Sequence, residues 1–188
     1  MGGGESLESA RVPKVIVVTG IMASGKSTVA QLLAEQFPRS VHVRGDWFRR
    51  IIVNGRAPMS PELSDDARAQ LRMRHRLAAQ AADAYAHEGF TVVVQDIVIG
   101  DLLAEFMSDI KSRPLALVVL APNPAAVRLR EAGRPKTGYV GGWTVDALDA
   151  WFRATTPRWG LWLDTSHQSP SDTVREVLAR LEEAVISL

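Results

Sequence analysis

The 188-residue sequence contains no cysteine, so it has neither disulfide bonds nor thiolate metal ligands. It also has no apolar run near the roughly 18–20 residues that a membrane-spanning helix needs. Its net charge is small, +1, with 22 Lys and Arg against 21 Asp and Glu. These absences favour a reducing, cytoplasmic setting. They argue against a membrane or a nucleic acid as a partner.

The length suits a single domain with a substantial buried core. The first residues, Met-Gly-Gly-Gly-Glu-Ser, lack the charged and then apolar layout of a signal peptide. We therefore expect residues 1–12 to form a disordered leader and residues 13–188 to form the folded domain.

Short apolar runs alternate with helical patterns along the chain. The runs typical of strands buried on both faces are Val15–Val18, Val41–Val43, Phe90–Val94, Leu115–Leu120 and Leu161–Leu163. Helical spacing predicts helices over Ser27–Gln36, Asp65–His87 and Ser171 to about Ile186. This alternation predicts one doubly wound α/β domain, a parallel sheet flanked by helices.

Two of these helices carry more detailed predictions. Ser171 follows Pro170 and is predicted to cap the last helix. On the long helix, one apolar side is predicted from Ala67, Leu71, Ala78, Ala81 and Tyr85.

The segment Gly20-Ile21-Met22-Ala23-Ser24-Gly25-Lys26-Ser27 has the spacing of a phosphate-binding P-loop, or Walker A motif. An apolar strand precedes it and an amphipathic helix follows it, which is the context that this motif requires. The glycines permit a turn in which backbone N–H groups face phosphate oxygens, and the helix adds its positive end. We expect residues 20–28, including Thr28, to bind a nucleotide. Lys26 would reach the β- and γ-phosphates, and Ser27 would ligate Mg²⁺.

Two carboxylates follow predicted strands. Asp96 ends the run Thr91–Asp96, which is typical of a Walker B strand, and we predict that it holds Mg²⁺. The alternative is a strand-ending aspartate that caps a turn. Asp46 follows the second strand and is placed to accept the proton of an attacking hydroxyl. It also suits the N-cap of a helix, and the two roles are compatible.

Arginines crowd the segment after the fourth strand. Arg130 and Arg134 lie one helical turn apart, so both are able to face the same phosphates or an adenine ring. We predict a lid over about residues 128–142 in which Arg134 neutralises charge on the transferring phosphoryl group. The alternative is an ordinary solvated helix.

Basic and aromatic residues elsewhere leave alternatives open. Arg72 and Arg76 are spaced to hold an anionic substrate group, although such faces are commonly only solvated. His75 is expected at the surface. Four of the five tryptophans fall between Trp143 and Trp162, where core packing is the default and an aromatic-walled substrate pocket the alternative.

With these positions placed, the chain resembles the small P-loop kinases of the shikimate, gluconate and nucleoside monophosphate kinase superfamily. It is most similar to chloramphenicol 3-O-phosphotransferase-like proteins. The resemblance runs through Val17–Ser27, Gly45-Asp46, Glu88–Gly100, the arginine-bearing lid and Leu163–Ser166. It implies a five-stranded parallel sheet of order 2-3-1-4-5, ATP with Mg²⁺, and transfer of the γ-phosphoryl group to a small-molecule hydroxyl with Asp46 as base.

We therefore predict a phosphotransferase whose acceptor is a hydroxyl of an antibiotic or a metabolite. One alternative is a nucleotide, nucleoside or nucleotide-sugar kinase, which an acceptor phosphate bound by Arg72 or Arg76 would favour. An alternative of another class is a regulatory P-loop ATPase. The guanine signature Asn-Lys-x-Asp of a GTPase is absent from the sequence. Monomer and homo-oligomer both stay open.

Overall fold

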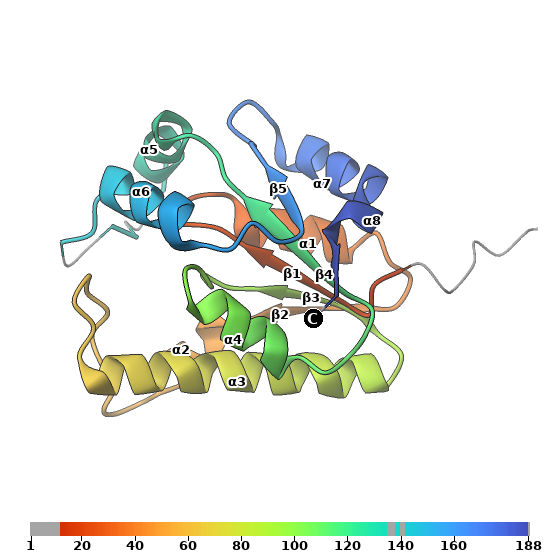
Figure 1. The fold of residues 1–188 in the computed structure, drawn as a ribbon, viewed down its shortest axis with the longest axis horizontal. Helices are drawn as coiled ribbons and strands as arrows, with labels where there is room; N and C mark the ends of the chain where they lie inside the picture. The colour runs from red at the N-terminus through yellow and green to blue at the C-terminus, as the bar shows by residue number, and fades with distance from the viewer. Residues whose placement is uncertain (1–11, 135–137, 140–141, 188) are drawn as a thin grey trace, which may run out of the picture.

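One mixed sheet organises the part of the chain that the computed structural model describes, residues 12–134, 138–139 and 142–187 (Figure 1). Its parallel strands follow the order β2-β3-β1-β4-β5. This order confirms the predicted one. The strands are β1 (Val15–Thr19), β2 (Ser40–Arg44), β3 (Thr91–Gln95), β4 (Leu115–Leu120), β5 (Leu161–Leu163) and the short β6 (Val185–Ile186).

Helices cover both faces of this sheet, as predicted for a doubly wound fold (Figure 1). They are α1 (Lys26–Ala34), α2 (Asp46–Arg50), α3 (Asp65–His87), α4 (Leu102–Asp109), α5 (Pro124–Ala132), α6 (Val145–Thr155), α7 (Pro170–Ala179) and α8 (Leu181–Ala184). None of the helices among the described residues is long and apolar enough to cross a membrane.

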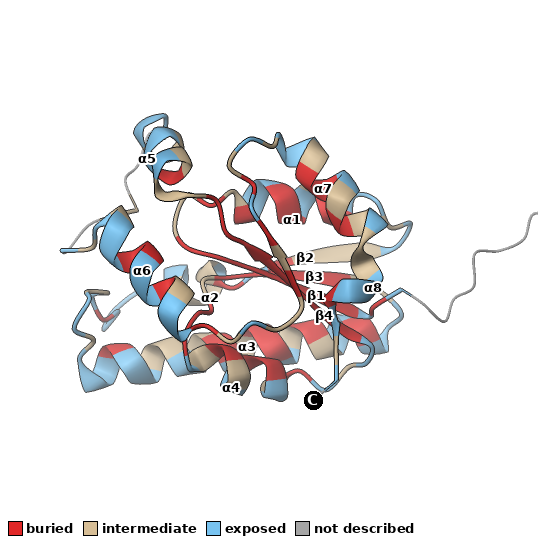
Figure 2. Cartoon of the chain, turned by 45° about the horizontal axis from the view of Figure 1, so that its top comes forward, coloured by how far each residue is buried: buried red, intermediate tan, exposed pale blue. Residues whose placement is uncertain are grey.

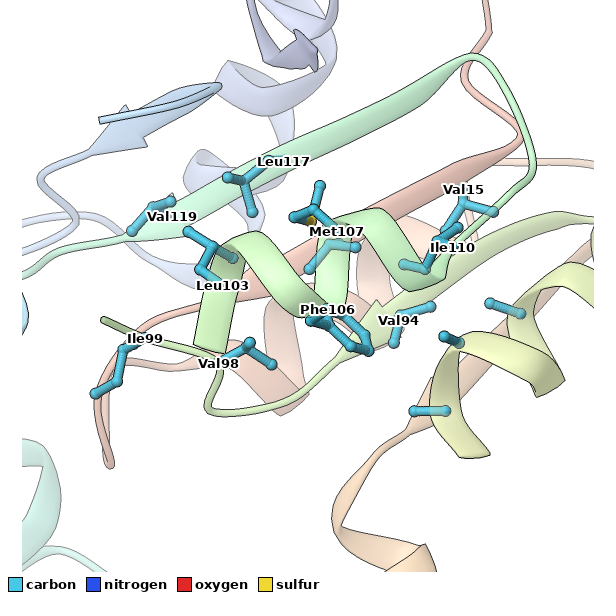
Figure 3. Close-up of a cluster of buried hydrophobic side chains, with 14 of the residues drawn as sticks. Val15, Val94, Val98, Ile99, Leu103, Phe106, Met107, Ile110, Leu117 and Val119 are labelled. Atoms are coloured by element: carbon cyan, nitrogen blue, oxygen red, sulfur yellow. The ribbon is translucent and has the colours of Figure 1, made fainter. Parts of the chain in front are cut away.

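Strand residues point alternately to two apolar cores, one on each face of the sheet. Figure 2 shows β1, β3 and β4 as a buried layer between the helices, whereas β2 at the edge of the sheet is only partly buried. On one face Val17, Val94 and Leu117 pack with α3, α4 and α6. Figure 3 shows α4 placing Phe106 and Met107 against these strands. The other face packs against α1, α7 and α8.

The end of the chain differs from the prediction of one long helix to about Ile186. Ser169, not Ser171, is the N-cap, because its hydroxyl accepts a hydrogen bond from the backbone N–H of Asp172 at 3.1 Å. The Asp172 carboxylate accepts from the Ser169 N–H in return, and Pro170 occupies the first helical position. The helix breaks at Arg180, and the following chain ends in β6, which pairs antiparallel with β4.

The buried face of α3 includes Ala67 and Ala78 as predicted, with Leu71 and Ala81 partly buried, and departs from the predicted face at Tyr85. Tyr85 is 44 % exposed, whereas the buried residues are Ala67, His75, Ala78, Ala79, Ala82 and Ala86. The small alanine side chains let the helix lie close to the sheet, so its apolar contact follows alanines rather than the larger Tyr85. The capping serine of α3 is Ser64, which accepts from the Ala67 N–H at 3.1 Å.

Candidate functional site

The carboxyl ends of the parallel strands border a pocket of about 980 Å³. One half, here called the P-loop half, is lined by Met22–Val29, Arg130, Arg134, Thr165 and Gln168. The other half, here called the α3 half, is lined by Asp46, Arg49, Arg50, Met59, Leu63, Leu71, Arg74, Ile97, Ile99, Leu102, Trp143, Leu148 and Trp151. The volume lies near the upper end of the roughly 300–1,000 Å³ that ligand sites occupy.

The P-loop joins β1 to α1 with a backbone that requires glycine at two points. Gly20 has a φ of 142°, and a Cβ there would lie 2.4 Å from the carbonyl oxygen of Leu120. Gly25 has a φ of 97°, in the left-handed region, and precedes the first residue of α1. The loop thus turns directly into a helix N-terminus, where backbone N–H groups lack partners within the helix.

Lys26 lies inside the loop with 6 % of its surface exposed. Its Nζ donates to the carbonyl of Ile21 at 2.7 Å and lies 3.5 Å from the hydroxyl of Ser24. Burial, followed by the charges of Arg134 and Arg74, lowers the pKa of Lys26 from 10.5 to about 7, while the charge of Asp46 acts in the opposite direction. Because its pKa is lowered, Lys26 is only partly protonated near neutral pH. Anionic groups that enter the pocket would favour its protonated, positively charged form.

This lowered pKa predicts a rise in stability with pH. Between pH 7 and 10 the unfolded chain binds a proton at Lys26 that the folded chain has lost, so the free energy of unfolding increases with pH. We expect a difference on the order of a few kcal/mol, since each pKa unit corresponds to about 1.4 kcal/mol. Urea denaturation of the wild type and of Lys26→Met at pH 7, 8.5 and 10 measures it. A wild-type curve parallel to that of Lys26→Met would contradict the assignment.

Oxygen atoms meet where β3 ends beside the P-loop. The hydroxyl of Ser27 donates to Oε1 of Gln95, the last residue of β3, at 3.0 Å. Gln95 therefore occupies the place next to Ser27 that the sequence assigned to Asp96. The amide of Gln95 was not among the predicted site residues.

Asp96 is buried, with 1 % of its surface exposed, and its carboxylate turns toward α3. Both its oxygens accept from the guanidinium of Arg74, from Nε at 2.7 Å and from Nη2. Its Oδ1 also accepts from the backbone N–H of Ile97 at 2.7 Å. Gly45 passes so close that a Cβ there would lie 2.0 Å from Oδ2 of Asp96. Asp96 thus ties β3, α3 and the start of α2 together.

His75 lies in the core beside this pair, not at the surface as predicted. It is 4 % exposed, and its ring packs against that of Phe106 in a tilted arrangement. Its Nε2 lies 4.0 Å from Oδ2 of Asp96. Burial, followed by the charge of Arg74, lowers the pKa of His75 to about 3, so the ring is neutral at neutral pH. His75 lies four residues after Leu71 and three before Ala78, so the predicted apolar side of α3 already includes its position.

Asp46 is the first residue of α2, with Gly45 as the N-cap, so the side chain of Asp46 does not cap the helix. Its carboxylate pairs with Arg50, one turn later, at 2.6 Å, and it lines the pocket. The side chain of Asp46 is one-third exposed. A carboxylate that reaches the pocket and is partly solvated is able to accept a proton from a bound hydroxyl.

Arg130 leaves α5 and crosses to the P-loop. Its Nη1 donates to the carbonyl of Ser24 at 3.3 Å, and its Nη2 donates to the carbonyl of Thr165, after β5. Burial lowers its pKa, opposed by the charge of Asp164. Arg130 therefore joins the P-loop to the turn before α7 and lines the pocket between them.

Arg134 also lines the P-loop half, although it lies beyond the end of α5 rather than on it. Its Nη1 pairs with Glu131 at 2.9 Å. The predicted lid, residues 128–142, lies partly outside the described residues, at 135–137 and 140–141. Within the described part, the Tyr139 hydroxyl donates to the carbonyl of Met22 at 2.9 Å and fixes this segment to the P-loop.

Arg74 is the main residue of the pocket that sequence reasoning missed. The sequence prediction chose Arg72 and Arg76, but Arg72 pairs with Glu105 at 3.3 Å on the surface, and Arg76 is exposed. Neither lines the pocket. The spacing held a usable signal, because position 74 lies seven residues after Ala67 and four before Ala78, on the buried face.

The four tryptophans between Trp143 and Trp162 divide between the two predicted roles, core packing and the wall of a pocket. Trp143 and Trp151 line the pocket, whereas Trp162 stacks on Phe152 at 5.1 Å between ring centroids. Trp159 packs against the apolar core. Core packing and a pocket wall are therefore both present in this region.

Comparison with known proteins gives one family match and many structural ones. A family model described as an AAA domain matches residues 15–155. A search among curated proteins finds no match.

Solved structures with the same fold include a sugar kinase from Janibacter sp. HTCC2649, 20 % identical with a TM-score of 0.65, covering 90 % of this chain and 95 % of that one. The tunicamycin resistance protein of Deinococcus radiodurans is 19 % identical with a TM-score of 0.63, covering 95 % and 100 %. The APS kinase of Mycobacterium tuberculosis, in complex with AMPPNP and APS, is 22 % identical with a TM-score of 0.66, covering 89 % and 96 %. At these identities the likeness establishes the fold.

Proposed function

Because the chain belongs to this AAA domain family and has the fold of the small P-loop kinases, we propose that it transfers the γ-phosphoryl group of ATP to a hydroxyl of a small molecule. One observation carries the proposal. A single pocket contains both the P-loop with Lys26 and, in its other half, the carboxylate of Asp46. A nucleotide-binding switch has no need of a carboxylate opposite its phosphates, but a transfer to an alcohol does.

The P-loop half would bind the triphosphate. Backbone N–H groups between Gly20 and Thr28 would surround the phosphates, and Lys26 would exchange its hydrogen bond to Ile21 for the β- and γ-phosphates. Arg130 and Arg134 would face the nucleotide from α5 and the segment after it. Arg134, close enough to lower the pKa of Lys26, would stabilise charge on the transferring group.

The oxygens at the end of β3 fit Mg²⁺, which prefers hard oxygen ligands and keeps several waters. No group of three or more His, Asp or Glu side chains that could together hold a metal ion occurs among the described residues, so the protein would supply few ligands directly. We propose the hydroxyl of Ser27, oriented by Gln95, as a direct ligand, and the carboxylate of Asp96, whose oxygens accept from Arg74 and from the Ile97 N–H, as a ligand that acts through water. When bound, Mg²⁺ would neutralise phosphate charge.

Asp46 would act as the general base. As the acceptor oxygen forms its bond to the γ-phosphorus, the hydroxyl proton passes to the Asp46 carboxylate, and the bond from phosphorus to the ADP oxygen breaks. Arg50, 2.6 Å from this carboxylate, holds it in place. α2 and the P-loop both follow parallel strands, so base and phosphates reach the same edge of the sheet.

Screening tests the proposal directly. The protein is incubated with Mg²⁺, [γ-³²P]ATP and a mixed library of antibiotics, sugars and nucleosides, and labelled products are separated. We expect label in one class of alcohol, with one ADP formed for each product molecule. If labelled inorganic phosphate is the sole labelled product whichever acceptor is present, the result would instead support the regulatory ATPase that the sequence left open.

A metal prediction accompanies this proposal. Chelation by EDTA should reduce transfer to background, and added Mg²⁺ should restore it. Ser27→Ala should raise the Mg²⁺ concentration for half-maximal rate about 10-fold or more, since loss of a residue that supports a metal site typically costs about 10–100-fold. Ser108→Ala, on the exposed surface of α4, is the matched control and should behave as wild type. An unchanged Mg²⁺ requirement in Ser27→Ala would remove Ser27 from the metal site.

A further inference from the structure

A row of polar side chains runs between α1 and the edge of the sheet, and it starts at the proposed metal ligand. Ser27, Gln31 and Glu35 recur every four residues along α1 and its C-cap, so they share one side of the helix. The sheet faces them with two polar side chains, Gln95 of β3 and His42 of β2. The core around this row is apolar, so its buried polar atoms depend on one another for hydrogen bonds.

His42 and Gln95 are neighbours across the parallel strands β2 and β3. His42 is paired in register with Val93, so Gln95 lies two residues further along, on the same face of the sheet. Gln95 is 6 % exposed, and its Oε1 accepts from the hydroxyl of Ser27 at 3.0 Å. The oxygen end of this amide therefore serves Ser27, and the N–H end is left for another partner.

The surroundings of His42 indicate which ring nitrogen carries the proton. The amide of Gln31 donates from Nε2 to Glu35 at 2.9 Å, because a carboxylate only accepts, and so turns its Oε1 toward His42. Nδ1 of His42 lies 3.0 Å from this oxygen and therefore donates to it. The other ring nitrogen, Nε2, is buried and has no hydrogen-bond partner among the residues that the structure describes.

The ring of His42 is neutral at neutral pH. Burial, followed by the charge of Arg44, lowers the pKa of His42 to about 4. The charge of Asp46 and a hydrogen-bonding contact with the side chain of Gln95 act in the opposite direction, but they do not outweigh burial. A protonated ring would donate from Nε2 and draw the oxygen of Gln95 away from Ser27. The neutral ring offers a lone pair at Nε2 instead, which suits the N–H end of the amide.

We propose that His42 is a positioning residue of the metal site, whose Nε2 accepts from the amide of Gln95 and so keeps the amide oxygen on Ser27. A hydroxyl that gives its proton to Gln95 turns its lone pairs toward the pocket, where Mg²⁺ would lie. The inference rests on the proposed function only for the presence of the metal. Loss of a residue that orients a metal ligand typically costs about 10–100-fold in metal affinity.

Metal binding to the full chain tests this inference without any acceptor. The protein is held in excess over AMPPNP, a non-hydrolysable ATP analogue, so that nearly all the analogue is bound. Mn²⁺ is then titrated at pH 7, and the free ion is followed by electron paramagnetic resonance. Calorimetry in EDTA measures the affinity for AMPPNP without metal, which a general defect of the P-loop would weaken and a misoriented hydroxyl would not.

Single variants give the first result. His42→Leu should raise the dissociation constant of Mn²⁺ about 10-fold or more, because it removes both ring nitrogens. His42→Gln should largely retain Mn²⁺ binding, since its Oε1 reaches the place of Nε2 and accepts in its stead. His87→Leu, the same change at an exposed histidine at the end of α3, is the matched control and should bind Mn²⁺ as wild type. The affinity for AMPPNP in EDTA should hardly change in any of the three.

A double variant and a spectroscopic signature separate positioning from packing. Because His42 acts through Gln95, His42→Leu/Gln95→Leu should lose no more Mn²⁺ affinity than Gln95→Leu alone. The ¹⁵N chemical shifts of the histidine rings at pH 7 report which nitrogen is protonated, and the signals of His42 are identified by their absence in His42→Gln. We expect its proton on Nδ1.

The outcomes distinguish this inference from the proposed function. Wild-type Mn²⁺ affinity in His42→Leu, losses that add in the double variant, or a proton on Nε2 would each overturn the role of His42 and leave the kinase intact. A matching loss of AMPPNP affinity in EDTA would overturn it as well, because His42 would then support the loop itself. A wild type that binds AMPPNP but no Mn²⁺ would overturn both the metal site and the role of His42. If all the expected metal results are obtained but no acceptor is phosphorylated, the role of His42 stands and the kinase is overturned.

Discussion

Asp46→Asn should lower kcat about 10²–10⁴-fold with the acceptor identified by screening, the range typical of a lost general base. Asparagine keeps the size of the side chain and an oxygen for Arg50, whose guanidinium lies 2.6 Å from the carboxylate. It is unable to take the proton of the attacking hydroxyl. The affinity for Mg-ATP, measured by calorimetry, should change less than about 3-fold, because Asp46 lies in the other half of the pocket from the P-loop.

The control for this variant is Asp146→Asn. Asp146 is an exposed aspartate of α6 that pairs with Arg128 at 2.7 Å and lies outside the pocket. It should retain the wild-type kcat. If Asp46→Asn also keeps near-wild-type transfer, Asp46 is not the base. If its ATP affinity falls as far as its kcat, the carboxylate acts on the nucleotide instead.

Arg74→Met should have the largest effect on folding. The Arg74 side chain is 12 % exposed and that of Asp96 is 1 % exposed, so removing the guanidinium leaves a carboxylate without its charged partner in the core. Breaking a buried ion pair in this way costs about 3–5 kcal/mol of the free energy of unfolding. Denaturation in urea at pH 7 measures the loss.

The double variant Arg74→Met/Asp96→Leu should recover most of that stability, because an apolar pair of similar volume replaces the ion pair. It should not recover transfer, since Asp96 is also the proposed metal ligand. Arg72→Met, two residues earlier on α3, removes an exposed pair with Glu105 and should cost less than about 1 kcal/mol. A loss in Arg74→Met no larger than in Arg72→Met would show that the buried pair contributes little.

The position of each parallel strand was predictable because apolar runs such as Leu115–Leu120 carry no competing signal, whereas the order of the strands was implied by the resemblance to the small P-loop kinases. The last helix was not predictable. Val174 and Val177 continue a helical pattern toward Ala184, but the helix breaks at Arg180 and β6 then pairs with Leu115 and Ala116 of β4, before the part of β4 that pairs with β5. Pairing between segments that are distant in the sequence is not predicted by local hydrophobic periodicity.

The residues of the site were predictable where the course of the backbone determines their position. They were not predictable where their position depends on the direction in which a side chain points. The P-loop residues and Asp46 line one pocket, as expected from their places after parallel strands. Arg74 and His75 were missed because their side chains were assigned to a solvated basic face, although both positions lie on the same side of α3 as Ala67 and Ala78. Gln95 rather than Asp96 lies beside Ser27, since neighbouring residues of a strand point to opposite faces.

The bonds of Arg130 have a consequence for how the chain folds. They join Ser24 to a residue 106 positions later, and Arg130 to Thr165 a further 35 positions on. Gly20 likewise packs against Leu120, so the P-loop reaches its final shape only after β4 and β5 have docked. Contacts between such distant segments form slowly, because the loops between them must close first. The P-loop, which precedes β4 and β5 in the sequence, is thus among the last segments to become competent, and acquisition of nucleotide affinity during refolding would report the completion of the whole sheet.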